Sequence, residues 1–343
     1  MTDKTIRPLA LALLAQVLLG LTLLFWAAQG FPLPSSMTGD AERTTTPRSA
    51  AGAEPAPAAK APAAAANAAA SDADTLAPRP TADRFDSKRA YALLREQVQR
   101  FGWRPAGSPA LRRLAMRLRA LLPGGRFEAV AGHPGLRNVV GSIAGRGKAI
   151  VVGAHYDVEA QPEGFVGAND GAAGTAAVVW LARSLARTPR PRDARPVRFV
   201  LFDGEEEPAG CTDFAACGLR GSRAYAERHA GELRSLVLLD YIAEKQGLRF
   251  PREGSSDVAL WSRLRSAARA VGVGRLFSDE AGPALLDDHT PFIERGIPAI
   301  DVIDFDYPQR DTLQDTLDRV SRRSLDAVGE AVHLLVSRLR RER

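Results

Sequence analysis

Cysteine and histidine are scarce in this sequence, and the shortage limits the kinds of site that it can build. The chain has 343 residues, of which only two are cysteine and five are histidine. Two cysteines are too few for a disulfide scaffold or for a zinc site based on cysteine.

Aromatic residues are also few, at 6%, and they are not interleaved with basic residues. The net charge of +6 comes from scattered basic residues, with arginine clusters mainly in predicted helices and at the end of the chain, such as 111–119 and 338–343. A nucleic-acid-binding protein gathers such charges on one face or along one groove. We therefore expect these charges to face solvent and predict no nucleic-acid partner.

One long apolar run stands near the start of the chain. Residues 9–28 provide about the 20 apolar residues that span a bilayer, and Lys4 and Arg7 precede them. This arrangement predicts residues 1–8 in the cytoplasm, 9–28 as a transmembrane anchor, and the rest of the chain outside the cytoplasm, periplasmic or extracellular. A cleaved signal peptide is the alternative, because Ala28 and Gly30 are small enough for a peptidase site. The length of the run favours the uncleaved anchor.

The composition then shifts to alanine, proline, threonine and serine over residues 29–84. This stretch lacks the bulky apolar residues that bury a core, so we expect a disordered linker. The folded domain is predicted at residues 85–343.

Buried strands and amphipathic helices alternate along that domain. The predicted strands are 138–143, 149–154, 197–202, 236–239 and 299–303, and the first two are expected to be neighbours. The predicted helices are 91–101, 111–122, 171–186, 220–229, 258–271 and 324–339. This alternation predicts a three-layer α/β/α sandwich with a mixed, mostly parallel central sheet, whose site lies at the carboxyl ends of the strands.

Chemistry-bearing side chains follow the strand at 149–154. His155 and Asp157 are two residues apart and so share one side of an extended backbone, while Asp170 stands just before the helix at 171–186. One imidazole with two carboxylates suits a divalent metal, usually zinc. The alternative is that Asp170 merely caps the helix at Gly171.

Further acids follow the later strands and precede the last one. They are Glu205, Glu206, Asp240, Asp287 and Asp288, with His289 directly after them. Carboxylates gathered at one sheet edge repel each other unless a cation neutralises them. The pattern therefore predicts a metal site. Adjacent side chains diverge, so Glu206 can bind the metal while Glu205 moves protons.

Several motifs resemble those of the M28 zinc-peptidase superfamily. They are HYD at 155–157, FVGANDGAAG at 165–174, FDGEE at 202–206, LLD at 238–240 and DDHTPFIERGIP at 287–298, together with PAGSPA at 105–110 and GSRAYA at 221–226. Within the superfamily the likeness is nearest to glutaminyl-peptide cyclotransferases. The resemblance covers the chain from about Phe85 to its end and implies a zinc-exopeptidase-like fold acting on peptide N-termini.

The resemblance also implies roles for single residues. It makes Asp170 and Glu206 zinc ligands and Glu205 the general acid and base. In the two-metal aminopeptidases of the superfamily, the positions of His155 and Asp240 hold a second zinc.

Around these residues the resemblance implies supporting roles. Asp157 would orient His155 in the aminopeptidases. In the cyclases, Asp240 and Asp287 belong instead to a hydrogen-bond network around the proton-transferring glutamate. His289 lies near the site and is expected to support it without binding the metal. His133, His229 and His333 are expected to be structural or solvent-facing.

The long segment 207–220 between the glutamate pair and the next helix resembles the cyclases more than the aminopeptidases. Cys211 and Cys217 flank TDFAA within it. In an oxidising compartment they would form one small disulfide that stiffens a wall of the cleft; two unpaired buried thiols are the alternative.

The pattern fails at one ligand. The superfamily normally supplies a histidine near the C-terminus, in the cyclases after a tryptophan. Here Thr312, Asp315 and Thr316 fit the frame, which puts Arg310 and Asp311 at those two positions. Asp311 would complete an all-carboxylate metal set, which is harder and less zinc-selective than one with imidazole. Alternatively, Asp311 pairs with Arg310 and the metal is lost.

Three hypotheses follow from the sequence. The first is an anchored glutaminyl cyclase-like zinc enzyme, acting on peptide or protein N-termini with one zinc. The second is an M28-type aminopeptidase with two metals. The third is a non-catalytic relative that binds peptides.

Overall fold

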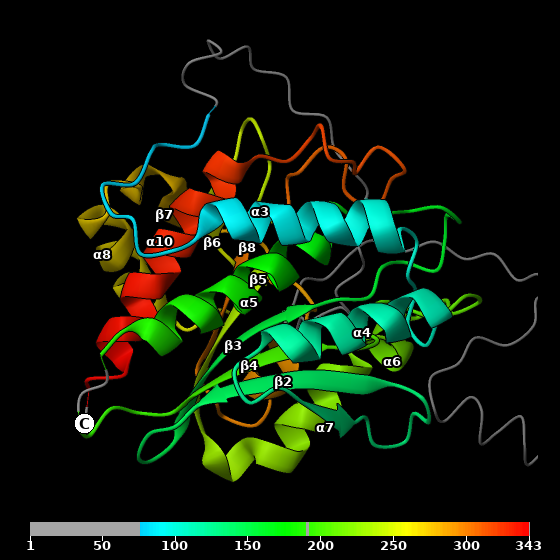
Figure 1. The fold of residues 1–343 in the computed structure, drawn as a ribbon, viewed down its shortest axis with the longest axis horizontal. Helices are drawn as coiled ribbons and strands as arrows, with labels where there is room; N and C mark the ends of the chain where they lie inside the picture. Colours follow the sequence, from blue (N-terminus) through cyan, green and yellow to red (C-terminus); the bar gives the residue numbers. More distant parts are fainter. Residues whose placement is uncertain (1–75, 190–191, 343) are drawn as a thin grey trace, which may run out of the picture. The chain divides into compact units, whose positions relative to one another are not determined.

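A six-stranded sheet positions the candidate site (Figure 1). The computed structural model describes residues 76–189 and 192–342, all within the unit Pro57–Arg343. The predicted segments 1–8 and 9–28, and most of the predicted linker, lie outside the described residues. Within the described part, no helix is both long and apolar enough to cross a membrane.

The described chain alternates helices and strands. The strands are β1 (Arg126–Ala129), β2 (Arg137–Ile143), β3 (Ala149–His155), β4 (Val197–Phe202), β5 (Leu233–Asp240), β6 (Phe250–Arg252), β7 (Phe277–Ala281) and β8 (Ala299–Ile303). The helices are α3 (Ser87–Glu96), the π-helical turn Gln97–Phe101, α4 (Pro109–Leu121), α5 (Ala172–Arg187), α6 (Phe214–Cys217), α7 (Arg220–His229), α8 (Val258–Ala270), α9 (Thr290–Ile293) and α10 (Arg322–Leu339). Two short 3-10 turns lie at Ala230–Glu232 and Gly274–Leu276.

The strand order is β1-β2-β4-β3-β5-β8, and β6 pairs with β7 in a separate small sheet. The four strands β4, β3, β5 and β8 are parallel, whereas β1 and β2 are antiparallel additions at one edge. The prediction of a mixed, mostly parallel sheet is therefore confirmed. The expectation that 138–143 and 149–154 are neighbours is wrong. The crossover through α5 places β4 beside β3, and β4 then separates β2 from β3.

Alternate residues of the strands enter two different cores. In β3, Ile150 and Val152 belong to the larger core, with helices α3, α4, α5, α8 and α10, whereas Val151 belongs to a second core with α7 and α9. A strand that is buried on both faces reads as a continuous apolar run. The central strands could therefore be predicted from the sequence. The helices on both faces of the sheet confirm the predicted three-layer sandwich.

The packed region begins upstream of residue 85, which corrects the predicted linker boundary. Ala77 is buried in the larger core, and the Thr81 backbone N–H donates to Val271 O at 2.9 Å. The buried carboxylate of Glu330 on α10 accepts from the backbone N–H groups of Arg84 and Phe85. The residues just before 85 are attached through small apolar side chains and backbone hydrogen bonds. Their composition therefore resembles that of the predicted linker, which is why the boundary was placed too late.

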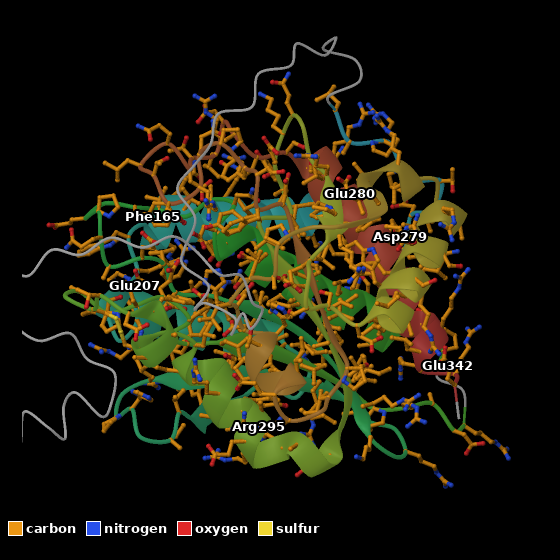
Figure 2. The ribbon with its side chains drawn as sticks, turned by 180° about the vertical axis from the view of Figure 1, so that it is seen from behind. Phe165, Glu207, Asp279, Glu280, Arg295 and Glu342 are labelled. Carbon is orange, nitrogen blue, oxygen red and sulfur yellow. A yellow bond between two sulfur atoms is a disulfide. The ribbon has the colours of Figure 1, made fainter. Side chains whose placement is uncertain are left out.

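The carboxyl ends of β3, β4 and β5 converge where their following loops meet. Seen from behind in Figure 2, Phe165 in the loop after β3 and Glu207 in the loop after β4 lie on the side of the molecule away from Glu342, near the C-terminus. The candidate site is built at this end of the sheet, as parallel sheets commonly arrange their sites.

Candidate active site

His155 is the last residue of β3 and the centre of the candidate site. Its Nε2 lies 3.1 Å from Asp170 Oδ1 and 3.3 Å from Asp240 Oδ1. The imidazole is only 3% exposed, and its Nδ1 makes no hydrogen bond. Nδ1 lies 3.8 Å from Asp157 Oδ1 and 4.0 Å from Glu205 Oε2. Sequence positions far apart therefore converge on one ring.

Asp170 reaches this ring from the loop that precedes α5. The helix begins after Gly171, whose φ is +75° and which has no side-chain cap. A Cβ on Gly171 would lie 2.6 Å from the carbonyl oxygen of Asp157, so this close approach requires glycine. The alternative that Asp170 is only a helix cap is wrong, because its carboxylate points toward His155 instead.

Two buried charged groups hold the loop that carries Asp170. The Asp315 carboxylate accepts from the backbone N–H groups of Asn169 and Asp170 at 2.9 to 3.0 Å. Arg104 is fully buried and donates to the carbonyl oxygens of Tyr156, Val166 and Gly167, among others. Burial lowers the pKa of Arg104 to about 10, and Asp170, Asp157 and Asp315 oppose that change. The arginine thus stays charged under an acidic loop.

Glu205 and Glu206 follow β4, and Asp157 fixes their backbone. The N–H of Glu205 donates to Asp157 Oδ1 at 3.3 Å, and that of Glu206 donates to Asp157 Oδ2 at 3.2 Å. Asp157 was expected to orient His155, but its 3.8 Å separation from Nδ1 is longer than a hydrogen bond. Its firm contacts in this structure are with the glutamate pair.

The site concentrates negative charge in a buried volume. Burial, reinforced by neighbouring acids, raises the pKa of Glu205 and of Glu206 well above the usual range. Burial also raises the pKa of Asp240 to about 7, against the opposing effect of His155. For His155, burial alone would lower the pKa, but the contacts with Asp157, Asp170 and Asp240 outweigh it and raise the pKa well above its ordinary value.

These residues fit a divalent metal. Among the described residues, two overlapping groups at this site have all their ligand atoms within 4.8 Å of one another: His155 with Asp170 and Asp240, and His155 with Glu205 and Glu206. Buried carboxylates with raised pKa values, beside an imidazole nitrogen without a hydrogen bond, are what a cation would satisfy. The nitrogen and oxygen donors suit zinc.

Asp311 reaches the same site through a tyrosine. The Tyr241 hydroxyl donates to Asp170 Oδ2 at 2.7 Å and to Asp311 Oδ1 at 2.9 Å. Tyr241 and Asp311 both have left-handed backbone conformations, with φ of +46° and +58°. Asp170, Glu206 and Asp311 do not form one of the close groups among the described residues, so that ligand set remains a prediction. Arg310 lies 3.8 Å from Asp311 Oδ2 and stacks over Phe305 at 3.7 Å.

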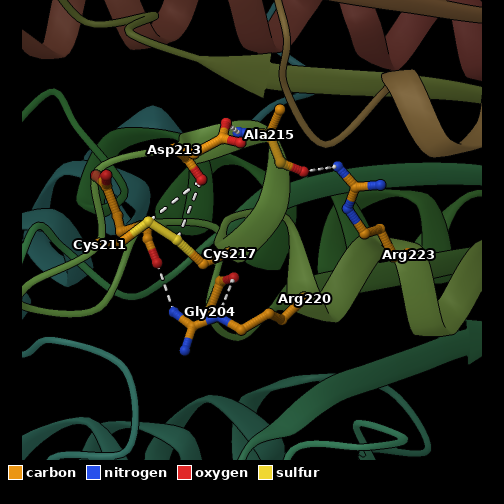
Figure 3. Close-up of a disulfide and its surroundings, with 8 residues drawn as sticks. Gly204, Cys211, Asp213, Ala215, Cys217, Arg220 and Arg223 are labelled. Carbon is orange, nitrogen blue, oxygen red and sulfur yellow. Dashed lines mark hydrogen bonds between the residues drawn. A yellow bond between two sulfur atoms is a disulfide. The ribbon is translucent and has the colours of Figure 1, made fainter. Parts of the chain in front are cut away.

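The loop after the glutamate pair is cross-linked. Cys211 and Cys217 form a disulfide with Cα atoms 6.6 Å apart, and the short helix α6 ends at Cys217 (Figure 3). Arg220 ties the base of the loop to the glutamate pair. Its side chain donates to the carbonyl oxygen of Gly204 (Figure 3) and to that of Glu206. The disulfide-bonded loop thus begins and ends beside the candidate proton-transfer residue.

Asp287 and His289 lie next to this site in a second buried group. Asp287, His289 and Asp301 also place ligand atoms within 4.8 Å of one another. His289 Nε2 contacts Glu253 Oε2 at 3.1 Å. Burial would raise the pKa of Glu253, but hydrogen bonds from His289 and two backbone N–H groups lower it to about 2. His289 thus contacts Glu253 and belongs to neither of the two close groups around His155.

The other histidines are away from the candidate site. His229 contacts Glu128 at 2.7 Å near the end of α7, and His333 is buried in α10. Burial lowers the pKa of His333 to about 4, so it stays neutral. His133 lies in a loop between β1 and β2.

Sequence reasoning missed Tyr241, Arg104, Glu253 and Asp301. Tyr241 follows Asp240 directly, so an aromatic residue after a predicted site acid was the one local signal. Arg104 and Asp301 carry no such signal, because an arginine before PAGSPA and an aspartate inside a strand reveal their burial only in the fold.

The family model of Peptidase family M28 matches residues 138–336. Aminopeptidase YwaD of Bacillus subtilis is 27% identical over 53% of this chain and 39% of its own. The glutaminyl-peptide cyclotransferase of Bos taurus is 26% identical over 60% of this chain and 66% of its own. The chain therefore spans less than two thirds of these relatives' lengths.

Solved structures show the same fold. The glutaminyl cyclase of an Acidobacteriales bacterium has a TM-score of 0.67 and 27% identity, covering 75% of this chain and 96% of that one. A Zn-dependent exopeptidase from Parabacteroides distasonis has a TM-score of 0.63 and 25% identity, covering 76% of this chain and all of that one. With the family match spanning more than half of its residues, this chain belongs to peptidase family M28.

Proposed function

We propose that this chain is a zinc-dependent enzyme that cyclises the N-terminal glutamine of peptides and releases ammonia. The α-amine nitrogen bonds to the carbon of the side-chain amide, the bond from that carbon to the amide nitrogen breaks, and ammonia leaves. The product is a pyroglutamyl peptide. The similarity to glutaminyl cyclases in sequence and structure supports this choice.

The observation that carries the proposal is the position of Glu205. Its carboxyl is buried 4.0 Å from His155 Nδ1, and burial raises its pKa, with His155 opposing the rise and Asp287 and Asp288 adding to it. A carboxyl whose pKa is raised accepts a proton more readily than an ordinary carboxylate does, and it can return that proton later in the reaction. Glu205 would take a proton from the α-amine and give it to the departing nitrogen.

Asp170 and Glu206 would hold the zinc, with Asp311 as the third ligand. A bound zinc supplies Lewis-acid polarisation of the amide carbonyl. Cyclisation asks less of the metal than hydrolysis does, because the nucleophile belongs to the substrate and no water has to be activated. An all-oxygen ligand set with a weakly Lewis-acidic metal therefore suits cyclisation better.

The second candidate is a two-metal aminopeptidase. Two observations favour it: the close group formed by His155, Asp170 and Asp240, and the relative YwaD. In that reaction Glu205 would take its proton from water instead of the α-amine, and the His155 group would hold the second metal.

One experiment separates the two. The full chain is incubated with zinc and either a peptide with N-terminal glutamine or an aminoacyl peptide, and the products are identified by mass spectrometry. We expect ammonia release with the peptide bonds intact, lost in Glu205→Gln and retained in the neighbouring control Glu207→Gln. Cleavage of the first peptide bond with no cyclised product would establish the aminopeptidase instead.

We also propose that residues 9–28 anchor the chain with its M28 domain outside the cytoplasm. Two features support this: the basic residues Lys4 and Arg7 before the apolar run, and the Cys211–Cys217 disulfide, which is stable in oxidising compartments. We expect the chain to stay in the membrane fraction after carbonate extraction. We also expect protease added outside the cytoplasmic membrane to digest the M28 domain. Release by carbonate would contradict the anchor.

A further inference from the structure

Positive charge is concentrated in one segment of the folded domain. Residues 87–121, from the start of α3 to the end of α4, contain nine lysines and arginines and a single acid, Glu96. Their net charge of +8 exceeds the +6 of the whole chain, so the remaining residues together carry −2. The net positive charge of this protein therefore belongs to two helices and the segment between them.

The fold exposes this charge on one side of the sheet. Helices α3 and α4 both pack on the larger core, and Figure 1 shows them on the near side of the molecule. Eight of the nine basic residues are exposed, and the ninth is the buried Arg104. The expected exposure of these residues is therefore observed, but the expected scatter is wrong for this segment, because α3 and α4 cover the same side of the sheet.

Few acids compensate the exposed charges. Asp86 pairs with Arg89, and Glu96 pairs with both Arg100 and Arg117. Within residues 76–189 and 192–342, no ion pair is formed by the other five basic residues, which are Lys88, Arg95, Arg112, Arg113 and Arg119. Charges of one sign on a common face repel each other, and an anionic partner would relieve that repulsion.

An apolar side chain lies among the arginines of α4. Met116 is 50% exposed and lies opposite the stripe of α4 that packs in the core. Its neighbours one helical turn away include Arg112, Arg113 and Arg119. Beside it lies a hollow of about 330 Å³, which is lined by Arg100, Phe101, Arg113, Met116 and Arg117. Guanidinium groups thus surround an accessible apolar surface.

We propose that this face of α3 and α4 binds the surface of an anionic phospholipid membrane. The arginines would pair with lipid phosphates, and Met116 would enter the boundary between headgroups and acyl chains. Met116 favours lipid over nucleic acid, because a nucleic-acid backbone is bound through its phosphates and offers no apolar layer. The anchor proposed at residues 9–28 would raise the effective concentration of lipid near this face, but the binding does not depend on the anchor.

The proposed membrane-binding face adjoins the candidate site without including it. The segment between α3 and α4 carries Trp103, whose ring N–H donates at 3.0 Å to the carbonyl oxygen of Glu159 in the loop after β3. Arg104, in the same segment, donates to Gly167 in the loop that carries Asp170. Membrane binding would therefore hold the candidate site close to the lipid surface and leave its residues free.

A fluorescent reporter on the full chain tests the proposal. The chain is incorporated into vesicles of neutral phosphatidylcholine, or of this lipid mixed with anionic phosphatidylglycerol, and an environment-sensitive dye is attached to Met116→Cys. Cys211 and Cys217 form a disulfide, so the dye reacts with the introduced thiol. We expect a blue shift and protection from iodide quenching in anionic vesicles only. Salt at about 1 M, which shortens the screening length to roughly 3 Å, should reverse both.

Charge removal on the two sides of the sheet provides the matched comparison. Arg113→Gln with Arg119→Gln should lower the ratio of bound to free domain about 25-fold, because each basic residue near such a surface contributes roughly a factor of five. Arg228→Gln with Arg295→Gln removes the same charge beside α7 and α9, which pack in the second core (Figure 2 labels Arg295). This control pair should leave the ratio unchanged.

Three results would overturn the proposal: equal emission in neutral and anionic vesicles, an equal shift from a dye on Glu227→Cys in α7, or equal binding by the two double variants. A shift caused by an added oligonucleotide and not by anionic lipid would assign the face to nucleic acid instead. None of these measurements uses turnover, so this proposal and the proposed cyclase activity fail separately.

Discussion

Backbone N–H groups hold the acids at the ends of β3 and β4, whereas side chains hold Asp311. Asp157 accepts from the N–H groups of Glu205 and Glu206, and Asp315 fixes the loop of Asp170 through two further N–H groups. Asp311 instead receives the Tyr241 hydroxyl and faces the Arg310 guanidinium. The candidate site therefore has a strand-end wall and a loop wall that differ in support.

The two walls are supported differently, and this difference in support affects what each wall can do. Backbone donors are set by the fold and keep their geometry whether or not a metal is bound, so the strand-end wall is preorganised. Side-chain donors have rotamers and must be ordered, which costs conformational entropy. We infer that proton transfer belongs to the rigid wall, and that the loop wall tunes metal affinity and access.

The largest effect is expected at the rigid wall. Glu205→Gln preserves the shape of the side chain but removes the group that moves the proton. We expect turnover to fall about 10²–10⁴-fold, as for the loss of a general acid or base. The Tm should stay the same or rise, because one of several mutually repelling acids becomes neutral.

Steady-state kinetics and thermal unfolding check this prediction together. Glu207→Gln is the matched control, because it removes the next carboxyl along the chain and should leave turnover near that of the wild type. If Glu205→Gln turned over substrate as fast as the wild type, Glu205 would not be the proton-transfer residue. The two walls would then not differ in function as inferred.

Two tyrosine variants test the contrast directly. The Tyr241 hydroxyl contacts Asp311 on the loop wall and also Asp170, whereas the Tyr307 hydroxyl donates at 2.8 Å to Asp315, which also has backbone donors. Tyr241→Phe should weaken zinc affinity about 10–100-fold, the usual effect of losing a group that orients a ligand. Tyr307→Phe should weaken it less, because the backbone donors to Asp315 remain.

Both affinities can be measured by competition with a zinc-binding dye. The two rings lie 6.0 Å apart and each variant keeps its ring, so apolar packing is matched. An equal or larger loss in Tyr307→Phe would show that backbone support does not preorganise the site.

The pH dependence of the metal-free protein tests the supporting acids. Asp203 directly follows β4 and accepts from the Arg137 backbone N–H at 2.8 Å and from the Tyr156 hydroxyl at 3.0 Å. Burial, reinforced by Asp157, raises the pKa of Asp203 to about 7, and burial likewise raises the pKa of Asp315 to about 7. The folded-state pKa then exceeds the unfolded one, so the stabilisation is complete below pH about 4 and is lost as the pH rises through about 7. We expect a lower free energy of unfolding at pH 8.5 than at pH 6.5.

Urea unfolding of the chelated protein at the two pH values measures this slope. Asp203→Asn should reduce the loss by about 0.8 kcal/mol, the contribution of one such proton between these two pH values. The buried His333 contributes about 0.4 kcal/mol in the opposite direction, because its folded pKa of about 4 lies below the ordinary histidine value. That contribution is the same in the wild type and in Asp203→Asn, so it cancels in their comparison. A stability that rises with pH would contradict the assignment.

The contrast between the walls also explains what could be predicted from the sequence. The strand-end acids were predictable because continuous apolar runs mark buried strands, and residues after parallel strands share one edge. Tyr241 was not predictable, since its contact with Asp311 depends on two left-handed backbone conformations. Nor was the order of β2, β4 and β3, because strand adjacency is set by the α5 crossover and not by local pattern. Glu253 was missed because β6 has only three residues.

The smallest effect is expected at the edge of the loop wall. Replacing Cys211 and Cys217 together by serine opens a disulfide that closes a short loop of six-residue separation. Chain entropy gives such a loop at most about 2 kcal/mol. Arg220 still ties the loop base to the carbonyls of Gly204 and Glu206, so the glutamate pair should keep its position. We therefore expect KM to rise a few-fold with kcat unchanged, measured on the glutamine peptide. If kcat fell instead, the loop would position Glu205, and the two walls would be one mechanical unit.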